Sequence, residues 1–464
     1  MVATDANAGP AIGAETSRYA KWAIALFFVT LCIPGSLNIG IRMTPYRFYL
    51  IAMAVPMILR FREDRTLRIT AVDVVFFLAI FWRSLSLLVN HQTSEILNAG
   101  SSFLEIFFGY MLGRVFIRGA ADYRYFFKCF LITLVFFLPF ALGELIFRQR
   151  FLRNLAGLVL TNEPIDASGS SVRYGFLRVR VSFDHAILFG NFCAIGFVNM
   201  FYLFRDEFFV KYLRMAFVGA MAVLSLSSSA VLILFLQSGL IFYERVMRFL
   251  PYRWVLMALG AVTVWFSFQL VFSMSIPEYI ATELVYSSAS GTARIDQLRF
   301  GLLEIYRNPI FGIGLRPYAH AFWRSDSVDS FYLWLAMKSG VPALIFFVVA
   351  LVLHFLNISF ARLANKDEES IRIGYQIGLL CQLLAIGVVF IWGIANVFVM
   401  MYIGAGAWFY NSIRPGPLTF QQQLTQRRAA GLAAAQAGAR RQGFTDGRRP
   451  VEWRGGRERG PERR

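Results

Sequence analysis

Apolar runs of about twenty residues recur along most of this 464-residue chain. A helix needs about that length to cross a bilayer, because every backbone polar group must be satisfied inside the segment. The runs lie near residues 22–40, 43–59, 72–90, 97–117, 125–147, 183–204, 254–273, 331–356, 373–391 and 393–411. Only 16% of the residues are charged and 57% are hydrophobic, which leaves a soluble fold nowhere to place its apolar excess. The pattern predicts an all-α integral membrane protein.

One further apolar stretch, 215–243, is too long for one span and short for two, and it is interrupted by serines at 225 and 227–229. Folding it as two short helices brings the prediction to about 12 transmembrane helices. With that number, every short loop on the side of the N-terminus is basic, as expected for cytoplasmic loops. One helix fewer would place the basic 244–253 loop and the C-terminal tail outside. We therefore predict that both termini are cytoplasmic.

This topology divides the chain into three parts. Residues 1–20 form a cytoplasmic N-terminal segment, and residues 21–411 form a polytopic membrane domain with long outer loops at about 148–182 and 274–330. Residues 412–464 form a tail with twelve arginines and four acidic residues, which contributes to the net charge of +18. Such a composition favours a disordered, solvated segment that is attracted to anionic lipid. We expect it to bind no nucleic acid.

Several classes of site are not indicated. The four cysteines, Cys32, Cys129, Cys193 and Cys381, all lie in apolar runs with no CxxC spacing, so we interpret them as small core residues. The sequence has no Walker loop, dinucleotide-binding glycine pattern or metal-ligand spacing. We therefore expect no cofactor and no metal site.

The second outer loop has an ordered series of features. Between residues 294 and 306, apolar residues recur at spacings close to helical, which predicts an amphipathic helix on the membrane surface. Asn308, Pro309, Gly312 and Gly314 then predict a sharp turn. A polar stretch ends in Asp329 and Ser330, where the chain re-enters the bilayer as an aromatic helix that reaches Gly340.

These features resemble the superfamily of O-antigen ligases and polymerases, polytopic bacterial enzymes that transfer glycans from undecaprenyl diphosphate. The resemblance rests on Arg294, the Asn-Pro-x-x-Gly-x-Gly run, the polar pair at 329–330, the serine-rich interruption at 225–229 and the stretch from Arg180 to His185. It covers about residues 180–345. It implies a multi-pass protein of the bacterial inner membrane that acts at the periplasmic face, with an undecaprenyl-diphosphate-linked glycan and membrane lipid as partners. A regulator of chain length is a further candidate partner.

One departure from the family bears on the activity. Ligases of this superfamily usually have a His-Asn pair at the re-entry point, whereas this chain has Asp329 and Ser330. The difference favours the exopolysaccharide polymerase branch, which joins lipid-linked repeat units. Transfer of O-antigen to lipid A core remains the alternative within the enzyme class. A polysaccharide or lipid transporter is the alternative from another class, although we find no internal repeat at a fixed offset.

The implied chemistry has two requirements. A departing diphosphate needs cationic stabilisation, which arginine forks supply, and the attacking sugar hydroxyl can use a base. The resemblance assigns the cationic role to Arg180 and Arg294, and we add Arg178, Arg299 and Arg316 as substrate-binding candidates. The candidate bases are Asp329 first, then His185 and His320.

Structural readings compete with each of these assignments. Asp329 could cap the helix that starts at Phe331, and His185 could make a structural hydrogen bond at a helix entrance. Arg83 and Glu105 lie inside predicted spans, where ionisable groups often mark function. They could pair with each other or with Glu144.

Overall fold

The computed structural model describes residues 17–39, 42–64, 66–160, 172–204, 208–271, 279, 288–320 and 327–411. Most of these residues are helical, and the strands form two short antiparallel hairpins, β1 with β2 and β3 with β4. The predicted tail, 412–464, and residues 1–16 of the N-terminal segment lie outside the described residues. An all-α architecture is therefore confirmed for the part of the chain that the structure describes.

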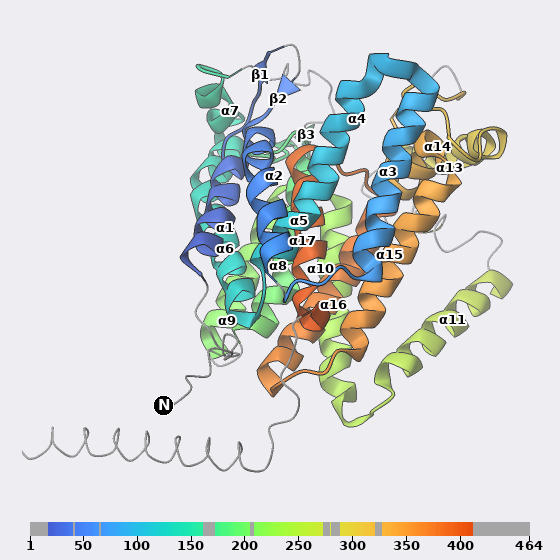
Figure 1. The fold of residues 1–464 in the computed structure, drawn as a ribbon. Helices are drawn as coiled ribbons and strands as arrows, with labels where there is room; N and C mark the ends of the chain where they lie inside the picture. The colour runs from blue at the N-terminus through green and yellow to red at the C-terminus, as the bar shows by residue number, and fades with distance from the viewer. Residues whose placement is uncertain are drawn as a thin grey trace, which may run out of the picture. The chain divides into compact units, whose positions relative to one another are not determined.

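The elements follow one another as a series of antiparallel helices (Figure 1). In the first half they are α1 (Arg18–Leu31), β1 (Leu37–Asn38), β2 (Arg42–Met43), α2 (Pro45–Glu63), α3 (Ala71–His91), η1 (Gln92–Glu95), α4 (Ile96–Phe103), the π-helical turn η2 (Leu104–Phe108), α5 (Gly109–Phe116), α6 (Ala120–Phe147), α7 (Phe151–Ala156), β3 (Val172–Arg173), β4 (Phe176–Leu177) and α8 (Ala186–Leu203). In the second half they are α9 (Phe208–Leu224), α10 (Ser228–Val246), η4 (Met247–Phe249), α11 (Arg253–Val271), α13 (Ser288–Arg307), α14 (Phe331–Ser339), α15 (Val341–Phe360), α16 (Lys366–Ile386), α17 (Gly393–Ala405) and α18 (Trp408–Asn411).

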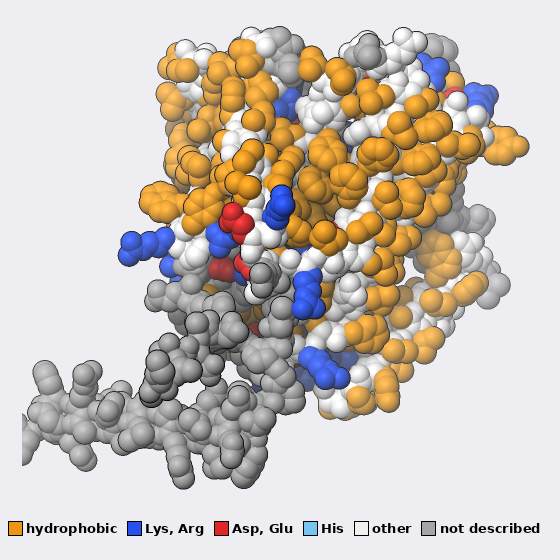
Figure 2. Space-filling model, in the orientation of Figure 1, with side chains coloured by type: hydrophobic (Ala, Val, Ile, Leu, Met, Phe, Trp, Pro, Cys, Tyr) orange, Lys and Arg blue, Asp and Glu red, His pale blue; other side chains and the backbone are white. Residues whose placement is uncertain are grey.

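Six of the described helical segments are long and apolar enough to cross a membrane: Ala71–His91, Ala120–Phe147, Ala186–Leu203, Ser228–Phe249, Val341–Phe360 and Gly393–Tyr410. Large apolar side chains cover much of the surface shown in Figure 2. Trp22, Ile132 and Phe235 are each more than two-thirds exposed. A surface of this kind is stable in lipid and not in water. The chain is thus a multi-pass membrane protein, and the number of twelve spans stays a prediction.

The helix boundaries agree with the prediction over 215–243 and differ from it over 331–356 and 22–40. The 215–243 stretch does form two helices, α9 and α10, which meet at Ser225–Ser227 as predicted. The predicted span 331–356, in contrast, is broken at Gly340 into α14 and α15. The first predicted span, 22–40, is also wrong in length, because α1 ends at Leu31 and β1 follows at Leu37.

Two helices, α8 and α17, form the centre of the bundle. In their apolar stretches 89% and 83% of the residues are buried, whereas only 33% are buried in each of α3, α10 and α15. A helix that is apolar on all sides belongs in the interior, and one with a single buried stripe belongs at the lipid boundary. The central α17 packs closely on α5 through glycines: a Cβ at Gly404 would lie 2.0 Å from the carbonyl oxygen of Tyr110.

This close crossing gives a first prediction. Gly404→Ala should destabilise the protein by about 1–3 kcal/mol, because the new methyl group can be accommodated only by moving the backbone of α5. The midpoint of thermal unfolding in detergent measures the effect. Gly239→Ala in α10 is the matched control, since a Cβ there meets nothing within 4 Å. Equal midpoints for the two variants would contradict the packing described for α5 and α17.

The segments that the sequence places outside the membrane gather towards one end of the bundle, the upper end in Figure 1. The β1–β2 hairpin, α7, β3, α13 and α14 all lie towards this end. The turn between α9 and α10 also lies at this end, because the backbone N–H of Val179 donates to the carbonyl oxygen of Leu224. Described parts of both predicted outer loops therefore lie at the same end of the molecule.

Candidate functional site

Four arginines are buried where the predicted first outer loop meets the bundle, and we call them the arginine cluster: Arg150, Arg153, Arg178 and Arg180. Each of these four arginines is between 3% and 7% exposed. Arginine is almost never buried to this degree unless its charge is paired. The partners of these four guanidinium groups therefore determine what the cluster can do.

Glu144, near the end of α6, organises one side of the arginine cluster. Its carboxylate is completely buried, and its Oε2 atom lies 3.0 Å from Nη1 of Arg150. The same oxygen accepts hydrogen bonds from the backbone N–H groups of Arg180, at 2.9 Å, and Val181, at 3.3 Å. Val181 has a φ of 51°, a left-handed conformation that is costly for a β-branched residue. Glu144 thus holds a strained turn as well as a charge.

Arg178 binds the serine turn between α9 and α10. Its Nε donates to the carbonyl oxygen of Ser225 at 3.3 Å, and the neighbouring Arg173 donates to the carbonyl oxygen of Leu226 at 2.8 Å. These carbonyls lie in the turn that follows the C-terminal end of α9 at Leu224. Burial, followed by the charges of Arg173 and Arg150, lowers the pKa of Arg178 to about 10. The pKa is lowered mainly because burial removes water from the guanidinium group, and the two neighbouring arginines lower it further.

Arg153 and Arg180 both bind the entrance of α8. Arg153 donates to the carbonyl oxygen of Phe183 and lies 3.3 Å from the carboxylate of Asp184. Arg180 donates through Nη1 to the carbonyl oxygen of Asp184 at 2.8 Å. His185 is the N-cap of α8, and its Nδ1 accepts from the backbone N–H of Ile187 at 3.2 Å. The predicted structural role of His185 is therefore present in the fold.

The sequence that contributes the arginine cluster has more basic than acidic residues. Between residues 144 and 185 the sequence contains six arginines, no lysine and four acidic residues. Among the described residues of this stretch, the acids are Glu144 and Asp184. Excess positive charge in a buried environment is costly unless an anion binds there. The arrangement is suited to a small polyanion that presents oxygen atoms to arginine forks.

A second polar cluster forms where α13 meets α14. The predicted amphipathic segment 294–306 is helical and lies within α13, and its apolar residues Leu298, Leu302 and Leu303 are about half exposed. Polar Gln297 and Glu304, in contrast, are buried. An apolar stripe turned away from the protein is what a helix lying against lipid requires.

Arg294 and Asp329 meet in this second cluster, with Nε of Arg294 3.5 Å from Oδ2 of Asp329. The backbone N–H of Asp329 donates to the side chain of Gln297 at 3.0 Å. The cap of α14 is Ser330, whose Oγ accepts from the backbone N–H of Leu333. The alternative in which Asp329 caps this helix is therefore wrong. Its carboxylate, 42% exposed, faces Arg294 instead.

The Asn-Pro-x-x-Gly-x-Gly run closes the other end of α14. The backbone N–H groups of Ile313 and Gly314 donate to the carbonyl oxygens of Met337 and Lys338, each at 3.0 Å. These carbonyls would otherwise lack partners at the helix end. Gly312 and Gly314 have φ near 60°, and a Cβ at Gly312 would lie 2.5 Å from the carbonyl oxygen of Met337. The glycines of this motif therefore have a structural role.

The remaining predicted residues lie outside both clusters. Arg316 is exposed and donates to the side chain of Asn90 at 2.9 Å and to the carbonyl oxygen of Ile313 at 3.1 Å, so it secures the glycine turn to α3. Arg299 is exposed on α13. The ring of His320 lies 4.8 Å from that of Tyr318, next to residues 321–326, which are not described. None of the three is placed at either cluster by a described contact.

A chain of aromatic contacts connects the two clusters. The ring of His185 lies 6.1 Å from that of Trp392, which stacks at 5.9 Å on Phe390. Phe390 in turn stacks at 6.2 Å on Phe331, the first residue of α14. The segment between α16 and α17 thus contacts His185, beside the arginine cluster, and Phe331, which follows the Arg294–Asp329 pair in the chain.

The ion pairs predicted within the membrane are different in the structure. Glu105 pairs with Arg47 at 2.8 Å, and Glu144 pairs with Arg150. Arg83 donates to Ser102 at 3.1 Å, and its guanidinium lies 4.8 Å from the centre of the Trp334 ring. The suggested pairings among Arg83, Glu105 and Glu144 are therefore not the ones that form.

Sequence reasoning did not select Arg150, Arg153 or Glu144 as site residues. Two signals in the sequence could have found them. Arg150 and Arg153 have the helical i, i+3 spacing that places two side chains on one face. Glu144 is a lone carboxylate near the end of an apolar span, and such residues often mark function.

The fold and the two clusters define the protein as a multi-pass membrane protein with a buried cationic site at one end of its helical bundle. No protein-family model matches the sequence, and no curated protein matches it. The activity of this multi-pass membrane protein is therefore inferred from its two polar clusters.

Proposed function

We propose that this protein polymerises glycan repeat units carried on undecaprenyl diphosphate, at the outer face of the bacterial inner membrane. The observation that carries the proposal is the gathering of four buried arginines beside Glu144 at one end of the bundle. The diphosphate of a lipid-linked donor is a polyanion that remains at the membrane surface while its hydrocarbon tail stays in lipid. The orientation proposed puts the arginine cluster at that surface, with both chain termini in the cytoplasm.

The reaction requires one bond to form and one to break. The hydroxyl oxygen of an acceptor sugar forms a bond to the anomeric carbon of the donor sugar, and the bond from that carbon to the diphosphate oxygen breaks. The hydroxyl proton passes to a base, and the lipid diphosphate leaves with the bonding electron pair. In this scheme Arg180 and Arg178 stabilise the negative charge that develops on the leaving diphosphate.

The second cluster supplies the remaining roles in this scheme. Asp329 is the base, because its carboxylate is partly exposed and is not used as a helix cap. Arg294 positions that carboxylate and adds a positive charge to the site. His185 is a less suitable base than Asp329, because its Nδ1 already accepts the hydrogen bond that starts α8.

A deletion strain tests the activity. Without the protein we expect single repeat units to accumulate on the carrier lipid, as measured by mass spectrometry of extracted lipids. Long polymer that remains on the carrier would instead identify a ligase. Unchanged glycans together with altered uptake of a small solute would identify a transporter. Either of these two results would overturn the proposal.

Complementation of the same strain tests the second cluster. Arg294→Lys keeps the charge but loses the planar fork, so we expect shortened polymer and accumulated repeat units. Arg307→Lys is the matched control, because Arg307 lies on the same helix, is exposed and pairs only with Glu304 among the contacts described for it. If polymer length is normal in both complemented strains, the role given to Arg294 is wrong.

A further inference from the structure

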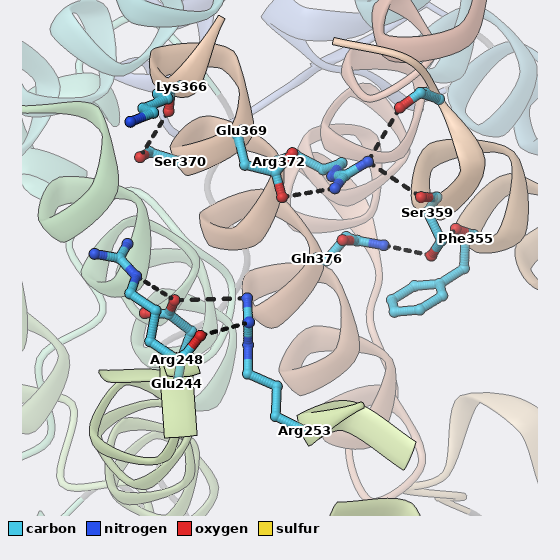
Figure 3. A network of polar contacts seen from close by, with 11 residues as sticks. Glu244, Arg248, Arg253, Phe355, Ser359, Lys366, Glu369, Ser370, Arg372 and Gln376 are labelled. Carbon is cyan, nitrogen blue, oxygen red and sulfur yellow. Dashed lines mark hydrogen bonds and ion pairs between the residues drawn. The ribbon is translucent and has the colours of Figure 1, made fainter. Parts of the chain in front are cut away.

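A further group of arginines, distinct from both clusters described above, lies where α10 is followed by α11, at the end of the bundle opposite the arginine cluster. Glu244, completely buried at the end of α10, is surrounded by Arg248 at 3.3 Å, Arg253 at 3.8 Å and Arg245 at 3.9 Å, as Figure 3 shows for the first two. Tyr202 donates to the same carboxylate at 3.1 Å. One carboxylate thus holds three guanidinium groups close to one another, and we call this group the arginine clasp.

The clasp retains an excess of positive charge. Arg245 and Arg248 keep 37% and 44% of their side-chain surface exposed, so they can bind a further anion. Arg253 Nε is buried and has no hydrogen-bond partner among the described residues. The stretch 244–253, which contributes the clasp, contains three arginines and one acidic residue, Glu244. The clasp is therefore preorganised for an anion by Glu244, as the arginine cluster is by Glu144.

Exposed aromatic residues lie next to the clasp in the sequence. Phe249 and Tyr252, in the turn between α10 and α11, are 76% and 73% exposed, and Phe208 at the start of α9 is 72% exposed. Exposed Tyr and Trp residues are enriched where the hydrocarbon core meets the lipid headgroups. Arg245 also lies 4.8 Å from the ring centre of Phe201. An exposed Tyr252 beside exposed arginines is the pattern expected near lipid headgroups.

Most of α11, the helix that follows the clasp, is exposed on every side. The first turn of α11 packs on the bundle through Trp254 and Met257. The ten residues 258–267 are all exposed, and ten residues cover every side of a helix. Figure 1 shows α11 diverging from the neighbouring α10. Apolar residues such as Leu259, Val262 and Phe266, each more than half exposed, must therefore be covered by acyl chains or by another protein.

We propose that an anionic phospholipid binds at the foot of α11, with its phosphate on Arg245 and Arg248 and its acyl chains along the side of α11 that faces the bundle. Charge complementarity at the clasp selects this occupant over a second copy of the chain, because a second copy would bring further arginines to the same place. The site is separate from the arginine cluster and does not depend on the activity proposed above. It takes a phosphodiester headgroup with a negative charge, whereas the arginine cluster takes a diphosphate.

The test uses the full chain, purified in detergent and supplied with phosphatidylglycerol. Native mass spectrometry measures the lipid that is retained, and a titration of the thermal unfolding midpoint measures its affinity. Arg248→Gln should weaken phosphatidylglycerol binding about fivefold, the effect of one basic residue at a lipid surface. Arg248→Lys should restore most of it. Arg62→Gln is the matched control, because Arg62 is an exposed basic residue in the last turn of α2.

Three outcomes would overturn the proposal. The first is equal retention of phosphatidylglycerol by the Arg248→Gln and Arg62→Gln proteins. The second is equal stabilisation by inorganic phosphate, which would make the clasp a site for the free anion. The third is a stable dimer that forms without lipid and shields α11, which would make a second copy the occupant.

Discussion

Glu144→Ala is expected to destabilise the protein by about 3–5 kcal/mol, the effect of removing one partner from a buried ion pair. Three losses contribute: the charge that balances Arg150, the acceptor for the backbone N–H of Arg180, and the acceptor that holds Val181 in its left-handed conformation. Thermal unfolding of the purified protein in detergent, followed by tryptophan fluorescence, measures the effect.

Two further variants sharpen this measurement. Glu144→Gln keeps an oxygen acceptor and removes the charge, so the difference between the Gln and Ala variants separates the hydrogen bonds from the ion pair. Glu63→Ala is the control, since Glu63 is an exposed carboxylate at the end of α2. A Glu144→Ala protein as stable as the Glu63→Ala protein would mean that Glu144 does not compensate the arginine cluster.

Arg180→Lys is expected to lower the rate of polymer formation about a hundredfold, the usual effect of removing one preorganised donor from a site of developing charge. The lysine ammonium can replace the hydrogen bond to the carbonyl oxygen of Asp184 or contact a phosphate oxygen, but it lacks the fork that lets arginine do both. The backbone N–H of residue 180 still donates to Glu144 in this variant. We therefore expect the fold to survive and the activity to be lost.

The assay for Arg180→Lys uses vesicles that contain the purified protein and its lipid-linked repeat unit. The control is Arg148→Lys in the same loop, because the Arg148 side chain is exposed and donates to the carbonyl oxygen of Gly175. A loss confined to kcat would support stabilisation of the leaving group, and a loss confined to KM would indicate uniform binding of the donor instead. Activity of the Arg180→Lys protein equal to that of the Arg148→Lys protein would remove Arg180 from the proposed mechanism.

Local patterns in the sequence predicted several features correctly. The serines in the 215–243 stretch separate α9 from α10, because polar residues in a long apolar run mark a place where the chain can turn. The helix over 294–306 follows from its apolar spacing. In both cases the determining residues lie within a few positions of one another.

Features that depend on distant residues were missed. Glu144 contacts the backbone of a turn 36 and 37 positions away, so no window of sequence brings them together. The break at Gly340 is hidden by the apolar residues around it and becomes clear only where the glycine meets the backbone of Ile310. The sequence offered Asp329 as a cap of α14, whereas in the structure Ser330 caps the helix and the Asp329 carboxylate lies beside Arg294.

The break at Gly340 has an electrostatic consequence for the second cluster. A continuous helix over 331–356 would have a single pair of poles, one near each side of the membrane. Interrupted after nine residues, it acquires a second pair, each pole equivalent to roughly half an elementary charge. The negative pole of α14 is covered by the N–H groups of Ile313 and Gly314, while its positive pole points towards Asp329 and Arg294. The short helix thus adds a fixed positive field beside the Asp329 carboxylate, in addition to the charge of Arg294.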